Sequence, residues 1–220
     1  NLAHELKTPI FNIQGFILTL LEGGMEDPEI NRKFLLKAAK NVERMSGLLE
    51  DLDVITKMEA GNLDIEMVPF DLLEIIRETM ESLEAKAKRN QIELVSKGGI
   101  DATKVMVLGD AAKIVQVLTN LIVNSINYGK EGGKTQIRYF DADEAILVEV
   151  ADTGIGISET DLPRVFERFY RVDKSRSRHA GGSGLGLAIV KHILEAHDQS
   201  ISVRSTVGEG STFSFTLQKA

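Results

Sequence analysis

The sequence contains no cysteine and no tryptophan, and only 5% of its 220 residues are aromatic. The absence of cysteine excludes disulfide bonds, thiolate metal ligands and thiol redox chemistry from this chain. With few aromatic side chains, the core must consist mainly of leucine, isoleucine and valine. No apolar run is long enough to span a bilayer, and no secretory signal peptide opens the chain.

An excess of positive charge is also missing. The formal net charge is −7, whereas general nucleic-acid binders are usually basic, so we expect no nucleic-acid partner. The chain does not begin with methionine and opens inside a helical pattern. We therefore expect a cytoplasmic fragment of a longer protein, attached to a membrane only through missing N-terminal parts.

The first 62 residues predict a pair of helices. Apolar residues recur with the three-and-four spacing of one helix face over 1–22, and again in a second segment that extends to about residue 59. Gly23 and Gly24 end the first helix, and Pro28 suits the first turn of the second. Because two helices cannot enclose a core, this pattern favours a four-helix dimer over packing on the rest of the chain.

The remainder of the chain mixes helices and strands. Late strands and glycine turns favour an α+β fold, an α/β sandwich with a mixed sheet covered by helices, over a doubly wound fold. Helices are expected near 71–89, 111–128, 159–169 and 185–197, and strands near 63–69, 91–96, 104–108, 134–140, 145–152, 200–205 and 211–217.

A histidine near the N-terminus is the first candidate reactive group. Residues 3–9 read AHELKTP, and helical geometry places His4 and Thr8 together on the side away from the apolar face. Glu5 can hold or deprotonate one ring nitrogen while the other attacks an electrophile. On its own, an exposed helical histidine is more often without a role, and a metal site lacks further ligands at an obvious spacing.

Three segments of the C-terminal half together predict a nucleotide site: 120–124 (NLIVN), 152–156 (DTGIG) and 182–186 (GSGLG). Asparagine oxygens suit Mg²⁺ that carries phosphate oxygens. Asp152 follows an apolar strand and can accept a hydrogen bond from the exocyclic amine of adenine. Glycines let the backbone approach a base, and free amides at a helix start bind phosphate.

Each of these segments also has an ordinary interpretation. The asparagines can form a polar stripe that faces water, and Asp-x-Gly is common in turns. The last glycine run does not directly follow a strand and lacks a GKS/T ending, so Rossmann and P-loop sites are excluded. The order of the segments along the chain carries the prediction.

Taken together, these segments resemble the catalytic core of the sensor histidine kinases of two-component signalling systems, over essentially the whole chain. Segment 3–9 resembles the H box of that family, and 120–128 its N box. Segments 152–156, 166–171 and 182–186 resemble its G1, F and G2 boxes.

The resemblance implies a dimerisation and histidine-phosphotransfer domain over 1–62, which forms a four-helix bundle as a homodimer. It implies a Bergerat-type ATP-binding domain over 63–220. The implied activity is ATP-dependent autophosphorylation on His4, followed by transfer to an aspartate in the receiver domain of a response regulator. Phosphatase activity toward that regulator is a further option, and the implied parent is a bacterial inner-membrane sensor.

The same resemblance implies roles for individual residues, with ATP and Mg²⁺ as cofactors. His4 accepts the phosphoryl group, Glu5 is its base or orienting partner, and Thr8 places water for dephosphorylation of the regulator. Asn124 holds Mg²⁺. The implied nucleotide contacts are Asn120, Asn124, Asn127, Tyr128, Asp152, Gly154, Gly156, Ile157, Arg171, Gly182, Gly184, Leu185, Gly186 and Thr212.

The chain departs from the family pattern in two places. Asn127 stands where many members carry a phosphate-contacting lysine, for which Lys130, Lys174, Arg176 or Arg178 are candidate substitutes. Residues 197–199 (HDQ) replace a common His-Gly-Gly turn, which we interpret as structural. Two other functions stay open: a gyrase-like ATPase without phosphohistidine, and a scaffold or phosphatase that does not phosphorylate itself.

Overall fold

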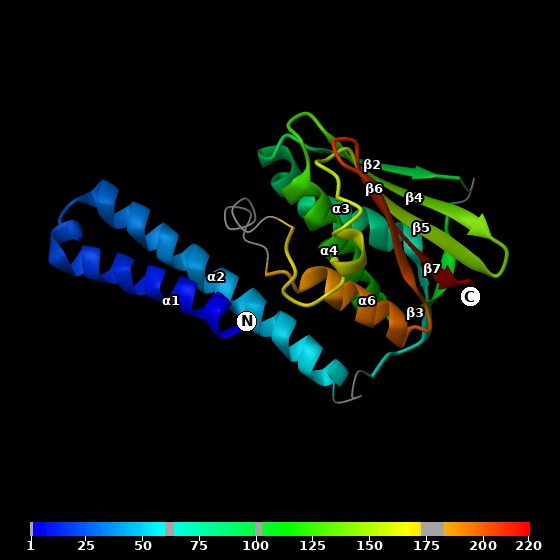
Figure 1. Cartoon of the computed structure of the whole chain (residues 1–220), viewed down its shortest axis with the longest axis horizontal. Coiled ribbons are helices and arrows are strands. Elements are labelled where there is room, and N and C mark those ends of the chain that lie inside the picture. Colours follow the sequence, from blue (N-terminus) through cyan, green and yellow to red (C-terminus); the bar gives the residue numbers. More distant parts are fainter. Residues whose placement is uncertain (1, 60–63, 100–102, 173–182) are drawn as a thin grey trace.

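The computed structural model describes residues 2–59, 64–99, 103–172 and 183–220, and of residues 2–5, 58 and 59 only the course of the backbone. A long helical hairpin is followed by a sheet domain, with the hairpin projecting to one side (Figure 1). The mixed α+β class expected from the sequence is confirmed.

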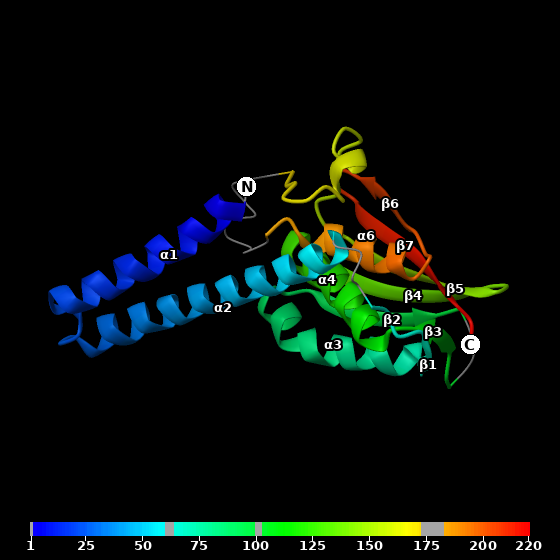
Figure 2. The same ribbon diagram turned by 90° about the horizontal axis from the view of Figure 1, so that it is seen from below.

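The hairpin contains α1 (Leu2–Thr19), a π-helical turn (Leu20–Gly24) and α2 (Pro28–Glu59). The beginning of α1 lies at the end of the hairpin nearest the sheet domain, and the connecting turn lies at the far end (Figures 1 and 2). This end of α1 carries the segment that resembles the H box.

Local signals explain where the two hairpin helices end and begin. Gly23 has a φ of 115°, a left-handed conformation that suits glycine and breaks the first helix. The Asp27 carboxylate accepts hydrogen bonds from the backbone N–H groups of Glu29 at 2.9 Å and Ile30 at 3.2 Å. Asp27 therefore caps α2, one residue before the predicted proline start.

The apolar face of the hairpin is covered only in part. Leu20 and Leu48 are buried, but Phe11, Leu21 and Leu36 remain 64%, 69% and 62% exposed. A single copy of the chain therefore leaves a large apolar surface open to solvent, as expected for helices that associate with a second copy.

The C-terminal half of α2 continues past α1 and packs on the sheet domain. Ile55 is 4% exposed and belongs to the same core cluster as the helices of that domain, and Val54 packs against the cluster. One continuous helix thus contributes to both parts of the structure (Figure 2).

The main sheet has the order β2-β4-β5-β7-β6, in which only the β2–β4 pair is parallel. A separate antiparallel pair joins β1 and β3. The strands are β1 (Val68–Asp71), β2 (Glu93–Gly98), β3 (Met106–Gly109), β4 (Lys134–Ala142), β5 (Ala145–Asp152), β6 (Ile201–Thr206) and β7 (Gly210–Gln218). The first strand thus begins later than predicted.

Helices α3 (Leu72–Arg89), α4 (Ala111–Tyr128) and α6 (Gly186–Ala196) cover one face of this sheet (Figures 1 and 2). Their apolar side chains meet alternate residues of β5 and β7, because side chains of a strand point to opposite faces in turn. The fully buried core therefore lies between helices and sheet.

The helix predicted for 159–169 is wrong. Within that range only Leu162–Arg164 is helical, as a short 3₁₀ turn. Successive N–H groups bond three residues back, from Arg164 to Asp161 and from Glu167 to Arg164. Phe169 then has a φ of 61°, which a helix does not allow. The segment is a series of tight turns beside the sheet.

The contacts of His197 confirm that the turn over residues 197–199 has a structural role. Its ring is buried, with Nδ1 2.7 Å from the carbonyl oxygen of Ile193 and Nε2 3.0 Å from the backbone N–H of Asp110. Because Nε2 accepts from Asp110, Nδ1 carries the proton and donates to Ile193. The ring therefore joins the end of α6 to the start of α4. The next residue, Asp198, has a φ of 56°, where glycine is common in the family pattern.

We predict that His197→Ala lowers the free energy of unfolding by about 2–4 kcal/mol, because it removes two hydrogen bonds and leaves a buried void. Thermal and urea unfolding measure the loss. The matched control is His192→Ala on the same helix, which removes a surface contact to Glu195 and should change stability by less than about 0.5 kcal/mol. Equal effects of the two substitutions would contradict the structural role of His197.

Candidate functional site

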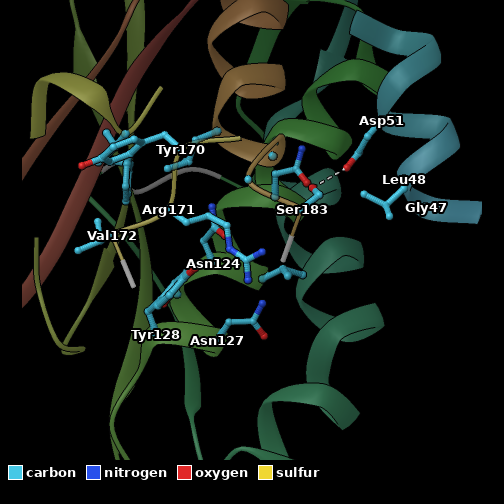
Figure 3. Close-up of a pocket in the computed structure, with 18 of the residues that line it drawn as sticks. Gly47, Leu48, Asp51, Asn124, Asn127, Tyr128, Tyr170, Arg171, Val172 and Ser183 are labelled. Atoms are coloured by element: carbon cyan, nitrogen blue, oxygen red, sulfur yellow. Dashed lines mark hydrogen bonds between the residues drawn. The ribbon is translucent and has the colours of Figure 1, made fainter. Parts of the chain in front are cut away.

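A cavity of about 700 Å³ lies between α4, the end of the sheet and α2 (Figure 3). Its size is typical of sites for small molecules and nucleotides. Of the predicted nucleotide contacts, it is lined by Asn120, Asn124, Asn127, Tyr128, Asp152, Gly156, Ile157, Arg171, Gly184 and Gly186.

The polar wall of the cavity comes from α4. The side chains of Asn120, Asn124, Asn127 and Tyr128 follow each other at spacings of four, three and one residues, so they share one side of the helix. Apolar residues of the same helix are buried against the sheet. Figure 3 shows Asn124, Asn127 and Tyr128 on the cavity side of the helix, with Arg171 reaching into the same space. The polar stripe therefore faces a cavity rather than open solvent.

Asp152 lies at the end of β5 and is held by backbone groups. Its Oδ1 accepts from the N–H of Gly154 at 2.7 Å and from the N–H of Ser211 at 3.3 Å. Burial raises the pKa of the Asp152 carboxyl, and these two hydrogen bonds act in the opposite direction. Among the described residues both bonds go to Oδ1, so Oδ2 can accept from a ligand in the cavity.

Two glycines allow the close packing around Asp152. Gly156 has a φ of 71°, and a Cβ there would overlap the carbonyl oxygen of Thr206. Gly210 has a φ of 127°, and a Cβ there would overlap the carbonyl oxygen of Asp152. Both positions require glycine for conformation and for space, so the backbone fixes the place of this carboxylate.

The start of α6 forms another part of the wall. Leu185 precedes the helix and offers no side-chain cap, while Gly186 and Leu187 line the cavity. Ser183 Oγ accepts from the N–H of Leu185 at 3.2 Å, and Gly184 takes a φ of 74° next to Phe169. The first N–H groups of α6 thus lie beside the cavity, as a phosphate-binding helix start requires.

Helix α2 closes the cavity from the side of the hairpin. Lys40, Arg44, Gly47 and Asp51 recur at four, three and four residues and line the cavity along one face of α2. Asp51 Oδ2 accepts from Ser183 Oγ at 3.1 Å (Figure 3). The pKa of Asp51 is raised, mainly by burial and also by the negative charge of Glu50, although the hydrogen bond from Ser183 acts in the opposite direction. This hydrogen bond links α2 directly to the residues before α6.

Some predicted site residues lie elsewhere. Gly154 and Leu185 do not line the cavity but support it, through Asp152 and the start of α6. Thr212 does not line it either, because its neighbours Ser211 and Phe213 face the cavity and strand residues alternate. The carbonyl oxygen of Gly208 accepts a hydrogen bond from Lys130, so that lysine does not replace the family lysine at the cavity.

Other predictions fall outside what the structure describes. These are Gly182, Lys174, Arg176, Arg178 and the side chains of His4 and Glu5. Thr8 is described, and its side chain is exposed on α1.

The sequence motifs did not predict several lining residues, which are Lys40, Arg44, Asp51, Lys86, Val165, Ser211 and Phe213. Ile155 and Tyr170 also line the cavity; they belong to the segments that resemble the G1 and F boxes, but had no predicted role of their own. The turn at 208–210 was a signal for Ser211, since it places the start of β7 beside the end of β5. No sequence signal marks the residues from α2 and α3, which reach the cavity through tertiary packing.

Two searches of the structure gave negative results. Among residues with described side chains, no group of three or more histidine and acidic residues could hold a metal ion. No helix in the described ranges has the length and hydropathy of a membrane span.

The fold and the cavity define a nucleotide-binding α/β domain joined to a helical hairpin. The family of "Histidine kinase-, DNA gyrase B-, and HSP90-like ATPase" domains matches residues 109–220. The "His Kinase A (phospho-acceptor) domain" family matches residues 1–61. The chain therefore belongs to the histidine kinase family and contains its phospho-acceptor and ATPase modules.

Curated sensor proteins align with almost the whole chain. Drug sensory protein A of Synechocystis is 38% identical over 228 residues, which cover 99% of this chain and 34% of that protein. Sensor histidine kinase WalK of Bacillus subtilis is 35% identical over 219 residues, which cover 99% of this chain and 35% of that protein. The chain thus spans about a third of the length of these relatives.

Solved structures share the fold. The histidine kinase AdeS of Acinetobacter baumannii superposes with a TM-score of 0.77 at 27% identity, covering 98% of both chains. The histidine kinase ThkA, solved in complex with the response regulator protein TrrA, has a TM-score of 0.75 at 26% identity, covering 99% of this chain and 60% of that one.

We predict that Gly156→Ala reduces adenine nucleotide affinity by at least about tenfold, because the added methyl group overlaps the backbone of Thr206 and displaces residues 155–157, which line the cavity. Isothermal titration with ADP measures the change. Gly132→Ala is the matched control: its φ of 73° is nearly the same, but nothing lies within 4 Å of the new Cβ. It should lose some stability and keep its affinity, and an equal loss of affinity in both variants would refute the packing argument.

Proposed function

We propose that this chain is the catalytic core of a sensor kinase that uses ATP to phosphorylate His4. The phosphoryl group then passes to an aspartate in the receiver domain of a response regulator. The observation that carries the proposal is the cavity itself, in which the predicted nucleotide contacts of the sheet domain meet the hairpin of the phospho-acceptor module. We divide the chain into a phosphotransfer domain over 1–62 and an ATP-binding domain over 63–220.

The base of the nucleotide binds at Asp152. The free Oδ2 accepts from the exocyclic amine of adenine, and the apolar side chains of Ile155 and Ile157 line the space beside it. Tyr128 packs on the nucleotide from α4, and Arg171, which also lines the cavity, covers it. The carboxylate of Asp152 accepts this hydrogen bond in its ionised form. Because its pKa is raised, we expect base binding to weaken as the pH falls and the carboxylate becomes protonated.

The phosphates extend from Asp152 toward the start of α6. The Nδ2 atom of Asn120 is buried and has no hydrogen-bond partner among the described residues. A buried donor without a partner costs about 1–3 kcal/mol, which a phosphate oxygen would recover. The free N–H groups at the start of α6 offer further donors.

Asn124 fits a Mg²⁺ ion that also binds phosphate. Its amide oxygen is a hard, neutral ligand, and its side chain lies one helical turn from Asn120 in the same cavity. A single protein ligand suits an ion that keeps water molecules and phosphate oxygens. Bound there, Mg²⁺ would neutralise phosphate charge.

The chemical step at His4 is a phosphoryl transfer. A ring nitrogen of His4 forms a bond to the terminal phosphorus of ATP, the bond from that phosphorus to the bridging oxygen breaks, and ADP leaves. Glu5 takes or shares the proton of the other ring nitrogen, which keeps the attacking nitrogen nucleophilic. In the second step an aspartate oxygen of the regulator takes the phosphoryl group, and the bond from phosphorus to the ring nitrogen of His4 breaks. In the phosphatase reaction, Thr8 places the water that hydrolyses this aspartyl phosphate and releases inorganic phosphate.

The exposed apolar surface of the hairpin supports a homodimer. Phe11, Leu21 and Leu36 lie on it, and two copies packed together would bury such side chains in a four-helix bundle. The response regulator is proposed from the family, as is a bacterial inner-membrane parent in which this chain forms the cytoplasmic part.

We predict that His4→Gln abolishes phosphorylation by ATP, because glutamine has no nucleophilic ring nitrogen. Nucleotide affinity should stay within about twofold, since His4 lies on the hairpin. Incubation with γ-labelled ATP and Mg²⁺ gives the readout, and the wild-type label should be acid-labile and base-stable. His192→Gln controls for loss of a histidine. Continued labelling of His4→Gln would exclude His4 as the acceptor.

We predict that Asp152→Asn weakens ATP binding by about 10–100-fold, because the new amide group faces the amine of adenine and leaves a buried donor unpaired. Inosine triphosphate carries an oxygen in place of the exocyclic amine of adenine, so Asp152→Asn should bind it more tightly relative to ATP than the wild type does. In the wild type, ATP affinity should fall as the pH decreases through the raised pKa of Asp152. If Asp152→Asn kept the wild-type preference for ATP over inosine triphosphate, the base would have to bind at a place other than residue 152.

A further inference from the structure

Lys86 is a cation of the cavity to which neither the family boxes nor the sequence pattern assigns a role. It belongs to the last turns of α3 and lines the same cavity as Asn124, Asn127 and Tyr128. Ile92, just after α3, packs near Gly129, just after α4, so the C-terminal ends of the two helices lie together. Lys86 therefore reaches the cavity from the helix next to the asparagine wall.

The surroundings of Lys86 leave its charge uncompensated. Among the described residues it forms no ion pair, whereas Lys88 on the same helix pairs with Glu84 at 2.7 Å. Burial lowers the pKa of the Lys86 ammonium group, and the charge of Arg89 lowers it further. Glu43, Glu50 and Asp51 line the same cavity, but none of them forms an ion pair with Lys86. A half-buried ammonium group that no carboxylate of the described residues pairs with favours an anion as its partner.

The other cations of the cavity are less suited to stay with a bound nucleotide. Arg44 and Arg171 already make contacts of their own. Lys40 and Arg44 also belong to α2 of the hairpin. Lys86 belongs to the same domain as the asparagine wall and the start of α6, which are the proposed phosphate contacts.

The asparagine wall beside Lys86 lacks the positive charge that phosphates favour. Asn127 is neutral, although it occupies the position of a phosphate-contacting lysine in many family members. A triphosphate next to Asn120, Asn124 and Asn127 would meet amides but no cation on α4. A positive group from a neighbouring helix can fill this role, because phosphate binding depends on charge and reach rather than on sequence position.

We propose that Lys86 binds the phosphate chain of the nucleotide and supplies the positive charge that Asn127 lacks. This inference rests on the proposed function, since it requires that the cavity bind ATP. It assigns to α3 a part of the site that the family motifs place on α4.

The test compares Lys86→Gln with Lys88→Gln, which removes an equal charge from the same helix on its exposed side. Isothermal titration with ATP and with adenosine gives the readout. Lys86→Gln should weaken ATP binding by about tenfold and leave the affinity for adenosine unchanged. Lys88→Gln should change neither affinity. Equal ATP affinity in the wild type and Lys86→Gln would overturn the proposal, as would an equal loss for ATP and adenosine.

A rescue experiment makes the test specific for charge. Adding Asn127→Lys to Lys86→Gln should restore most of the ATP affinity, because the lysine returns to the family position. In the wild-type protein, ATP should also slow acetylation of Lys86 but not of Lys88, as measured by mass spectrometry. Failure of both rescue and protection would contradict the proposal.

These outcomes distinguish a failure of the proposed function from a failure of the role proposed for Lys86. A wild-type protein that does not bind ATP would refute the proposed function. A wild-type protein that binds ATP, together with a Lys86→Gln variant that binds it equally well, would refute only the role of Lys86.

Discussion

The packing of α2 on two different partners is the constraint on which the rest of the structure depends. Along its first half α2 pairs with α1, and near its end Ile55 is buried in the core of the sheet domain. No break separates these regions, because the helix is continuous from Pro28 to Glu59. The phospho-acceptor module and the nucleotide cavity are therefore joined by one helix, and the Asp51–Ser183 hydrogen bond connects it to the start of α6.

The chemistry of the cavity follows from the backbone geometry around a half-buried carboxylate, that of Asp152. Gly154 and Ser211 hold one oxygen of Asp152, and the conformations of Gly156 and Gly210 let the neighbouring strands approach it closely. The other oxygen stays available to a base. The amides of α4 and the start of α6 line the same cavity. We propose that they bind the phosphates of a nucleotide whose base binds at Asp152.

Patterns local in sequence predicted much of this arrangement. The helical period of α4 predicted its polar wall, and the end of an apolar strand placed Asp152. The helix over 159–169 was wrong because positive φ at Phe169 and turn-type bonds are set by packing against the sheet. Thr212 does not line the cavity, because the register of β7 decides which alternate residues face it. Lys86 and the α2 wall could not be predicted, since they come from helices that meet the site only through tertiary contacts.

We propose that this cavity binds ATP with its base at Asp152 and its phosphates toward Asn120 and the start of α6. A crystal structure of the chain with Mg²⁺ and a non-hydrolysable ATP analogue would show the position of the nucleotide. We expect the adenine amine within hydrogen-bond distance of Asp152 Oδ2 and the ion on Asn124. An analogue bound outside this cavity, or one in the reverse orientation with phosphates at Asp152, would contradict it.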